Sequence, residues 1–237
     1  MKRGLLFGVL GVLGIAVTGI TFWVYELHKN GTTVREMLEY QYRMATEESD
    51  DKPVIYLYSD IDNKPVRVWI GTEHEITCVY PKQDSNDAWQ VYANKDSRIC
   101  DQSGKEYNYL FWEGLSDMSC DYSKGFCVKG EDSIAFLEDS LSKLGLTCRE
   151  ANEFIVYWLP KLEKNKYNLI SFQTDCYTNA YDLHVEPAPD NMLRVFMAFK
   201  PLEEEIDIKA QDLDELRGSF KREGFYVVEW GGREEKR

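Results

Sequence analysis

Two acids occur in stretches of similar composition, and both residue type and context suit acid–base chemistry. Residues 107–114 read YNYLFWEG and residues 225–232 read FYVVEWGG, so each stretch combines aromatic residues with an acid, a tryptophan and glycine. If two such acids lie close together, one protonated and one ionised, they suit hydrolysis of a glycosidic bond. Glu113 and Glu229 are therefore the candidate catalytic residues. The alternative is that each acid marks only the end of a strand that is buried on both faces.

The aromatic side chains beside these acids suggest a second role, the binding of sugar rings. Side chains alternate along a strand, so one face of the first stretch is predicted to carry Tyr107, Tyr109, Phe111 and Glu113. The candidate binding residues are Trp112, Trp230 and Tyr109. The alternative is that most of these rings belong to the core.

A third candidate is a metal site on one strand face. Asp182, His184 and Glu186 alternate within a strand expected at residues 182–187, and imidazole and carboxylate ligands suit zinc or manganese. Positions two apart on a strand are about 7 Å apart, which is wide for one ion, so a solvated polar face is the alternative. The sequence contains no nucleophile elbow, zinc-protease helix motif or phosphate-binding loop. We predict no cofactor.

The N-terminal segment has the composition of a membrane anchor. Lys2 and Arg3 precede an uncharged run from residue 4 to residue 25, which is as long as the roughly 20 residues that a transmembrane helix needs. The positive-inside rule puts the N-terminus in the cytoplasm and the main domain outside the membrane. Small residues on one helix face (Gly4, Gly8, Gly11) suggest homodimerisation through the anchor, and cleavage of the segment as a signal peptide is the alternative.

Charge and cysteine content restrict the function further. The chain has 28 basic and 41 acidic residues, a formal net charge of −13, and such a field repels phosphate backbones, which argues against nucleic-acid binding. An even number of cysteines in an extracytoplasmic domain predicts disulfide bonds of undetermined pairing. The alternative is free thiols. The disulfide candidates are Cys78, Cys100, Cys120, Cys127, Cys148 and Cys176.

Hydrophobic periodicity predicts a helical hairpin in the middle of the chain. Within residues 130–146, apolar residues recur at helical spacing and Gly145 is placed to end the helix. Thr147 and Glu150 then match a capping box that opens a second helix, which Pro160 is expected to kink or stop.

The remaining segments are predominantly strand-like. Short β-branched and aromatic runs are expected to form strands at 53–59, 66–71, 75–81, 167–173, 182–187, 193–201 and 225–232, with a meander at 88–114. Strands, a helical hairpin and strands again predict an α+β domain with an antiparallel sheet or sandwich. The predicted organisation is an anchor at 1–25, a juxtamembrane helix and linker at 26–52, and an extracytoplasmic domain at 53–237.

Several blocks of the chain resemble a known family. The blocks KPVIYLY, YNYLFWEG, NEFIVYWLP, NKYNLISFQ, LRVFMAFKPL and GFYVVEWGG resemble a family of uncharacterised bacterial proteins, often predicted to be secreted or membrane-anchored. The resemblance covers about residues 52–232 and implies no particular activity or functional residue. The cysteines are not part of the family pattern, so it implies that any disulfides are local additions.

Together these features predict a membrane-anchored domain that binds a cell-envelope ligand: a glycan, a wall polymer or a protein. Binding is favoured over catalysis because no catalytic motif is present. The alternative is an envelope-acting hydrolase that uses Glu113 and Glu229, or a metal at His184. A third interpretation is a structural subunit of a membrane complex.

Overall fold

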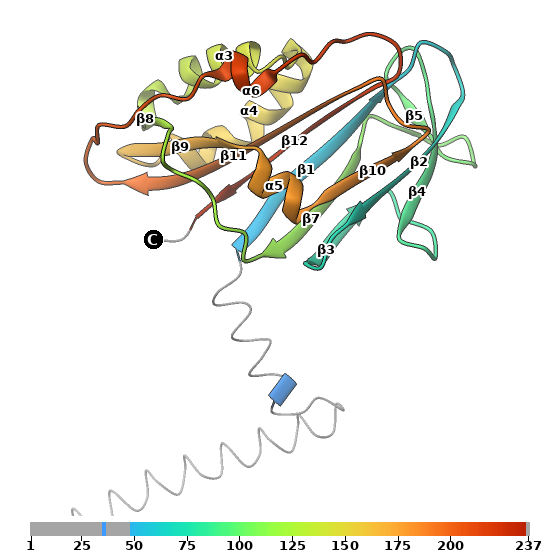
Figure 1. Ribbon diagram of the computed structural model, residues 1–237, viewed down its shortest axis with the longest axis horizontal. Helices are drawn as coiled ribbons and strands as arrows, with labels where there is room; N and C mark the ends of the chain where they lie inside the picture. The colour runs from blue at the N-terminus through green and yellow to red at the C-terminus, as the bar shows by residue number, and fades with distance from the viewer. Residues whose placement is uncertain (1–34, 37–47, 236–237) are drawn as a thin grey trace, which may run out of the picture. The chain divides into compact units, whose positions relative to one another are not determined.

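A mixed seven-stranded sheet forms the central layer of the computed structural model, which describes residues 35–36 and 48–235 (Figure 1). Its strand order is β3-β7-β1-β12-β11-β9-β8. Neighbours are antiparallel except for the parallel pair of β11 and β12. The strands are β1 (Glu48–Tyr58), β3 (Glu75–Tyr80), β7 (Leu110–Ser116), β8 (Phe126–Lys129), β9 (Tyr167–Gln173), β11 (Asn191–Leu202) and β12 (Tyr226–Glu234).

A five-stranded antiparallel sheet packs on one face of the central sheet, in the order β10-β2-β4-β5-β6. Its strands are β2 (Lys64–Gly71), β4 (Ala88–Ala93), β5 (Ile99–Cys100), β6 (Glu106–Tyr107) and β10 (Asp182–Glu186). The core between the two sheets includes Ile55 and Trp112 from the central sheet and Val68 and Trp89 from the smaller one. All four side chains are at most 1% exposed, so burial of apolar surface holds the sheets together.

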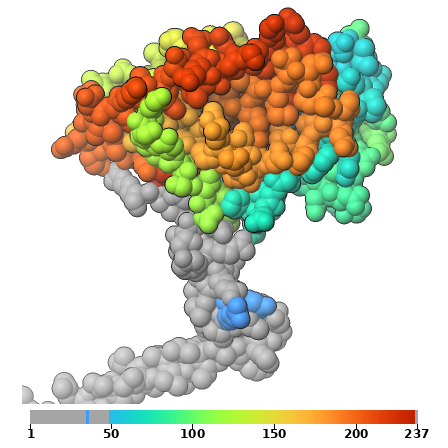
Figure 2. All heavy atoms as spheres, in the orientation of Figure 1, coloured from blue at the N-terminus to red at the C-terminus, as the bar shows by residue number. Residues whose placement is uncertain are grey.

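Helices cover the other face of the central sheet (Figure 1). They are α3 (Ser133–Lys143), preceded by the short 3₁₀ helix η1 (Gly130–Asp132), α4 (Cys148–Leu162) and α6 (Leu213–Arg217), whereas α5 (Asp175–Ala180) packs with the core between the sheets. Leu137 of α3 and Phe154 and Trp158 of α4 are fully buried against the sheet. Figure 2 shows that late segments of the chain, in orange and red, form most of the face in view, with the β2 to β4 region at one end.

The predicted helical hairpin is present, and α4 begins where the sequence indicates. The Thr147 side chain accepts a hydrogen bond from the backbone N–H of Glu150, and the Glu150 side chain accepts one from the N–H of Thr147, which confirms the capping box. Pro160 does not end α4, which continues to Leu162. Val156 and Pro160 are both exposed, so the proline lies on the solvent side and its ring does not disturb the packed face.

The β-rich architecture agrees with the antiparallel part of the predicted fold, but the domain is built from two sheets and one parallel strand pair. The folded unit begins at Glu48, so β1 includes the last residues of the predicted linker. Lys52 has a φ of 51°, and the strand pairing shifts between Asp51 and Val54. A β-bulge therefore occupies the predicted domain boundary.

The predicted membrane anchor requires correction. In the part of the chain that the structure describes, no helix is long and apolar enough to cross a membrane; α4 has 15 residues, against the roughly 20 that a span requires. The predicted anchor at 1–25 lies outside the described residues. The structure thus does not support a single-pass anchor, an extracytoplasmic localisation or a homodimer formed through the anchor.

The predicted disulfide bonds are also wrong. All six cysteines are free thiols. A disulfide requires two Cα atoms about 4.4–6.8 Å apart with converging side chains, and no two of these cysteines, such as Cys78 in β3 and Cys100 in β5, have this geometry.

Candidate functional site

The strand register separates the two candidate catalytic acids. Residues paired on neighbouring strands point to the same face of a sheet. In β1, Val54 pairs with both Phe111 and Trp230, whereas Ile55 pairs with both Leu110 and Glu229. Glu113, two residues after Phe111, thus shares the helix-covered face, and Glu229 points towards the five-stranded sheet. The predicted pair of carboxylates does not form.

The Glu229 carboxylate is a buried partner of other side chains in the core. Its carboxylate is fully buried and forms an ion pair with Arg194 at 2.5 Å (Nε to Oε2). It also accepts a hydrogen bond of 3.2 Å from the indole Nε1 of Trp112. Burial lowers the pKa of the Arg194 guanidinium, but the adjacent Glu229 carboxylate raises it, and the net shift is upward. Glu229 is therefore an internal counter-ion that substrate cannot reach.

The two candidate binding tryptophans belong to the core. Trp112 and Trp230 are both 0% exposed, and the Trp230 indole donates to the Tyr56 hydroxyl at 3.2 Å. Neither ring is accessible to a ligand. The apolar character of both strand faces already indicated such burial.

The glycines in the two stretches have a packing role. A Cβ atom on Gly114 would lie 2.9 Å from the carbonyl oxygen of Glu75 in β3, and one on Gly232 would lie 2.5 Å from that of Met197 in β11. Both distances are shorter than van der Waals contact. Each glycine therefore allows a neighbouring strand to approach, which accounts for the shared pattern of the stretches without catalysis.

The predicted metal ligands do not form a coordination site. His184 stacks on Trp69 with ring centroids 4.7 Å apart, and its Nε2 lies 3.1 Å from Asp182 Oδ2. Glu186 lies two positions further along β10, where it is opposite Arg67 of β2 in the strand register. Among residues 35–36 and 48–235, no group of three His, Cys, Asp or Glu side chains is arranged to hold a metal.

Tyr109 and Glu113 line an open pocket of about 760 Å³. It lies where β3, β6 and β7 approach α4, with Lys52 from the bulge of β1. The pocket is lined by Lys52, Tyr80, Arg98, Glu106, Tyr107, Asn108, Tyr109, Phe111, Glu113 and Tyr157. The side chains predicted to share one strand face, Tyr107, Tyr109, Phe111 and Glu113, all line this pocket. Tyr80 and Tyr157 join them through tertiary contacts that strand alternation cannot reveal.

Two ionisable groups of this pocket, the Glu113 carboxyl and the Tyr107 hydroxyl, have raised pKa values for different reasons. Burial, together with the nearby Asp51, raises the pKa of the Glu113 carboxyl. The Tyr107 hydroxyl donates a 2.8 Å hydrogen bond to Asp101, which raises the pKa of Tyr107 to about 12. At neutral pH the Tyr107 hydroxyl thus keeps its proton. The Glu113 carboxyl loses its proton at a higher pH than an exposed glutamate does.

Cations lie against the tyrosine rings. The Lys52 ammonium is 5.2 Å from the Tyr157 ring centroid, and that of Lys105 is 5.2 Å from the ring of Tyr107 and 5.8 Å from that of Tyr80. Cation–π attraction of this kind contributes about 0.5–1 kcal/mol at exposed sites. The site therefore combines aromatic surfaces with polar and charged groups around them.

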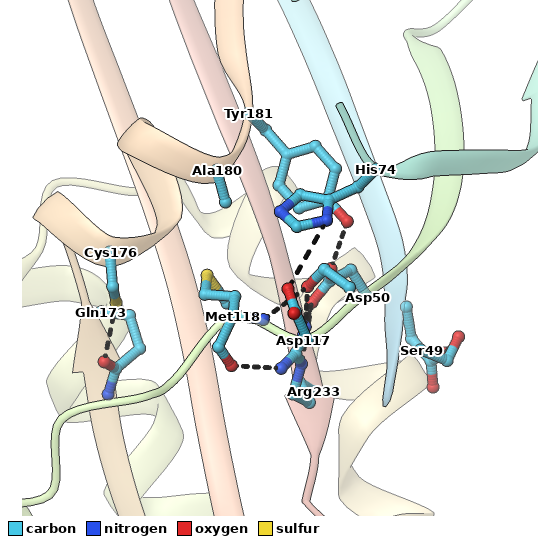
Figure 3. A network of polar contacts seen from close by, with 12 residues as sticks. Ser49, Asp50, His74, Asp117, Met118, Gln173, Cys176, Ala180, Tyr181 and Arg233 are labelled. Carbon is cyan, nitrogen blue, oxygen red and sulfur yellow. Dashed lines mark hydrogen bonds and ion pairs between the residues drawn. The ribbon is translucent and has the colours of Figure 1, made fainter. Parts of the chain in front are cut away.

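A second polar cluster lies at the opposite end of β1 from the turn to β2 and was not predicted (Figure 3). Asp50 is fully buried and binds Arg233 at 2.6 Å, and it accepts hydrogen bonds from Tyr181 at 2.5 Å and Ser116 at 2.9 Å. Arg233 also donates to the carbonyl of Met118 at 2.9 Å. These groups satisfy one another, so the cluster joins strands rather than forming an open site.

Comparison with known proteins finds a relative in Butyrivibrio fibrisolvens, described as "Uncharacterized protein in bglA 3'region". The sequences are 42% identical over 65 residues, which are 27% of this chain and 67% of the relative. No family model matches the chain, and no solved structure matches it. The relative's description states no activity, so the chemistry of the pocket provides the evidence for function.

Proposed function

The chain belongs to the same family as the Butyrivibrio fibrisolvens protein, and we propose that it binds a glycan in the tyrosine-lined pocket. The observation that carries this proposal is the lining itself. Four tyrosines and a phenylalanine share one open cavity of about 760 Å³ with asparagine, glutamate, lysine and arginine side chains. Binding sites of this kind combine an apolar surface with a few convergent polar groups.

A sugar ring matches both parts of this lining. The C–H face of a pyranose is apolar and packs on an aromatic ring, and its hydroxyls both donate and accept hydrogen bonds. Tyr80 supplies an accessible ring, with 51% of its surface exposed. Asn108 and Glu106 at the same pocket supply amide and carboxylate partners.

One observation favours hydrolysis as a second candidate function. Glu113, with its raised pKa, suits a general acid, and Glu106 lines the same pocket. Glu106 is engaged in a 2.7 Å ion pair with Arg98, and both side chains are about half exposed. Glu229 is not available as a partner because it is buried on the other face of the sheet. Binding without cleavage remains our proposal.

The proposal is tested by titrating the purified full chain with soluble oligosaccharides and by co-sedimentation with insoluble polysaccharides. Tyr80→Ala is the diagnostic variant because Tyr80 lines the pocket and its ring is half exposed. Tyr92→Ala is the matched control, since Tyr92 is 36% exposed and lies outside this pocket. We expect Tyr80→Ala to weaken binding about tenfold, which corresponds to about 1.4 kcal/mol, and Tyr92→Ala to bind as the wild type does.

Two results would contradict the proposal. If no saccharide binds, the glycan function is wrong. If both tyrosine variants bind as the wild type does, the pocket is not the binding site. Release of soluble sugars that stops in Glu113→Gln would instead establish hydrolysis.

A further inference from the structure

The position of Lys52 narrows the class of ligand. Its φ of 51° lies in the left-handed region, which residues other than glycine adopt uncommonly. The strand pairing is interrupted here, between Asp51 and Val54. Bulges re-aim side chains, and strained backbone is concentrated at functional sites. Lys52 lies in this bulge, its side chain lines the pocket, and its ammonium lies over the Tyr157 ring.

The other cations near Lys52 already have acidic partners. Arg98 binds Asp96 at 2.5 Å and Glu106 at 2.7 Å, and Lys161 binds Asp51 at 2.5 Å. Within the described ranges, 35–36 and 48–235, the backbone N–H of Lys52 donates to the Glu113 carboxylate, and its ammonium contacts an aromatic ring and attracts Glu113 without forming an ion pair. Its ammonium is thus a charged group on the pocket wall that can still take an anionic partner.

Lys105 places a second such cation by the pocket. Its ammonium lies near the rings of Tyr80 and Tyr107, both of which line the cavity. A ligand that stacks on these tyrosines therefore brings its ring substituents near an ammonium group. In a chain with 41 acidic and 28 basic residues, Lys52 and Lys105 are thus two cations that lie against the tyrosines of the pocket.

We propose that the pocket selects glycans that contain a uronic acid and that Lys52 binds the sugar carboxylate. This inference rests on the proposed glycan binding and names the class of glycan. A carboxylate on a pyranose ring can approach the ammonium while the ring stacks on tyrosine. A charge-assisted hydrogen bond of this kind is stronger than a neutral one.

The test compares two ligands of the same size, trigalacturonic acid and its methyl ester, by calorimetric titration of the full chain. The ester keeps the sugar rings and removes the negative charges. We expect the wild type to bind the acid at least tenfold more tightly than the ester. Lys52→Met keeps the aliphatic stem and removes the charge, and we expect it to lose most of this preference.

Lys64→Met is the matched control. The Lys64 ammonium also lies over an aromatic ring, 5.1 Å from the centroid of Phe225, and Lys64 does not line the pocket. This variant should keep the wild-type preference for the acid. Reduction of the preference in both lysine variants would assign it to general charge rather than to Lys52, and would overturn the inference.

The remaining outcomes separate this inference from the proposed function. Equal binding of acid and ester by the wild type, or an unchanged preference in Lys52→Met, would overturn the role of Lys52 and leave glycan binding intact. Failure of all saccharides, neutral and acidic, would refute both proposals.

Discussion

At the scale of single residues, Glu113 and Glu229 have similar sequence contexts and different environments. Glu113 lines an open pocket, whereas Glu229 is a buried partner of Arg194. The difference arises from strand register. Two successive residues of β1, Val54 and Ile55, point to opposite faces of the sheet, and Glu229 pairs with Ile55, whereas Glu113 lies on the face of Val54. A one-residue difference in register reverses the face of every side chain, so local sequence could not separate the two roles.

Glu113→Gln is expected to change how stability depends on pH. Burial beside Asp51 raises the pKa of Glu113 above its ordinary value of 4.5, so folding favours the protonated form. The resulting stabilisation is complete below about pH 4.5 and is lost as pH rises through the raised pKa. Glutamine has no proton to lose. The variant should therefore gain stability relative to the wild type between acidic and neutral pH, as measured by urea denaturation.

The control for this change is Glu131→Gln, which removes one negative charge from an exposed position on η1. It measures the general effect of reducing the net charge. If the two variants show the same pH dependence, the environment of Glu113 does not favour its protonated form, and our description of the pocket electrostatics is wrong.

At the scale of elements, local signals were the most informative. The apolar spacing and the Thr147–Glu150 pattern predicted two helices with a short connection, and α3 and α4 match them. Strand positions such as 53–59 and 167–173 were also recognised from β-branched and aromatic runs. The assignment of strands to two sheets and the parallel pair of β11 and β12 were not predicted. Pairing depends on contacts between distant segments, which single-strand patterns do not contain.

Thr147→Ala is expected to destabilise the fold by about 1 kcal/mol, because the substitution removes the N-cap acceptor of α4. The measurement is the free energy of unfolding from a denaturant titration. Ser142→Ala, an exposed substitution inside α3, is the control and should be nearly neutral. An equal effect of the two changes would mean that the cap contributes no stability.

At the scale of the whole molecule, buried polar groups join segments from the two ends of the folded unit. Asp50 near the start of β1 and Arg233 near the end of β12 form a buried ion pair (Figure 3). The Asp50 carboxylate also accepts hydrogen bonds from Ser116 of β7 and from Tyr181. Burial raises the pKa of Asp50, while the positive charge of Arg233 opposes this shift. No short motif predicted this cluster, because its members are far apart in the sequence.

Arg233→Met is expected to destabilise the domain by about 3–5 kcal/mol, since it leaves Asp50 as a buried charge without its partner. Addition of Asp50→Asn should restore part of the loss. Arg98→Met is the control: Arg98 also forms two ion pairs but is half exposed, and we expect a much smaller loss of stability, because solvent screens exposed ion pairs. Similar losses in both single variants, again from denaturant titrations, would contradict the structural role of the Asp50 cluster.

The most direct measurement of the central claim is hydroxyl-radical footprinting of the full chain with and without a saturating glycan. Mass spectrometry would quantify oxidation at each tyrosine. We predict that the glycan protects Tyr80 and Tyr107, which line the pocket, and leaves Tyr92 unchanged. Saturated binding without protection of Tyr80 and Tyr107, or with equal protection of Tyr92, would show that the tyrosine-lined pocket is not where the glycan binds.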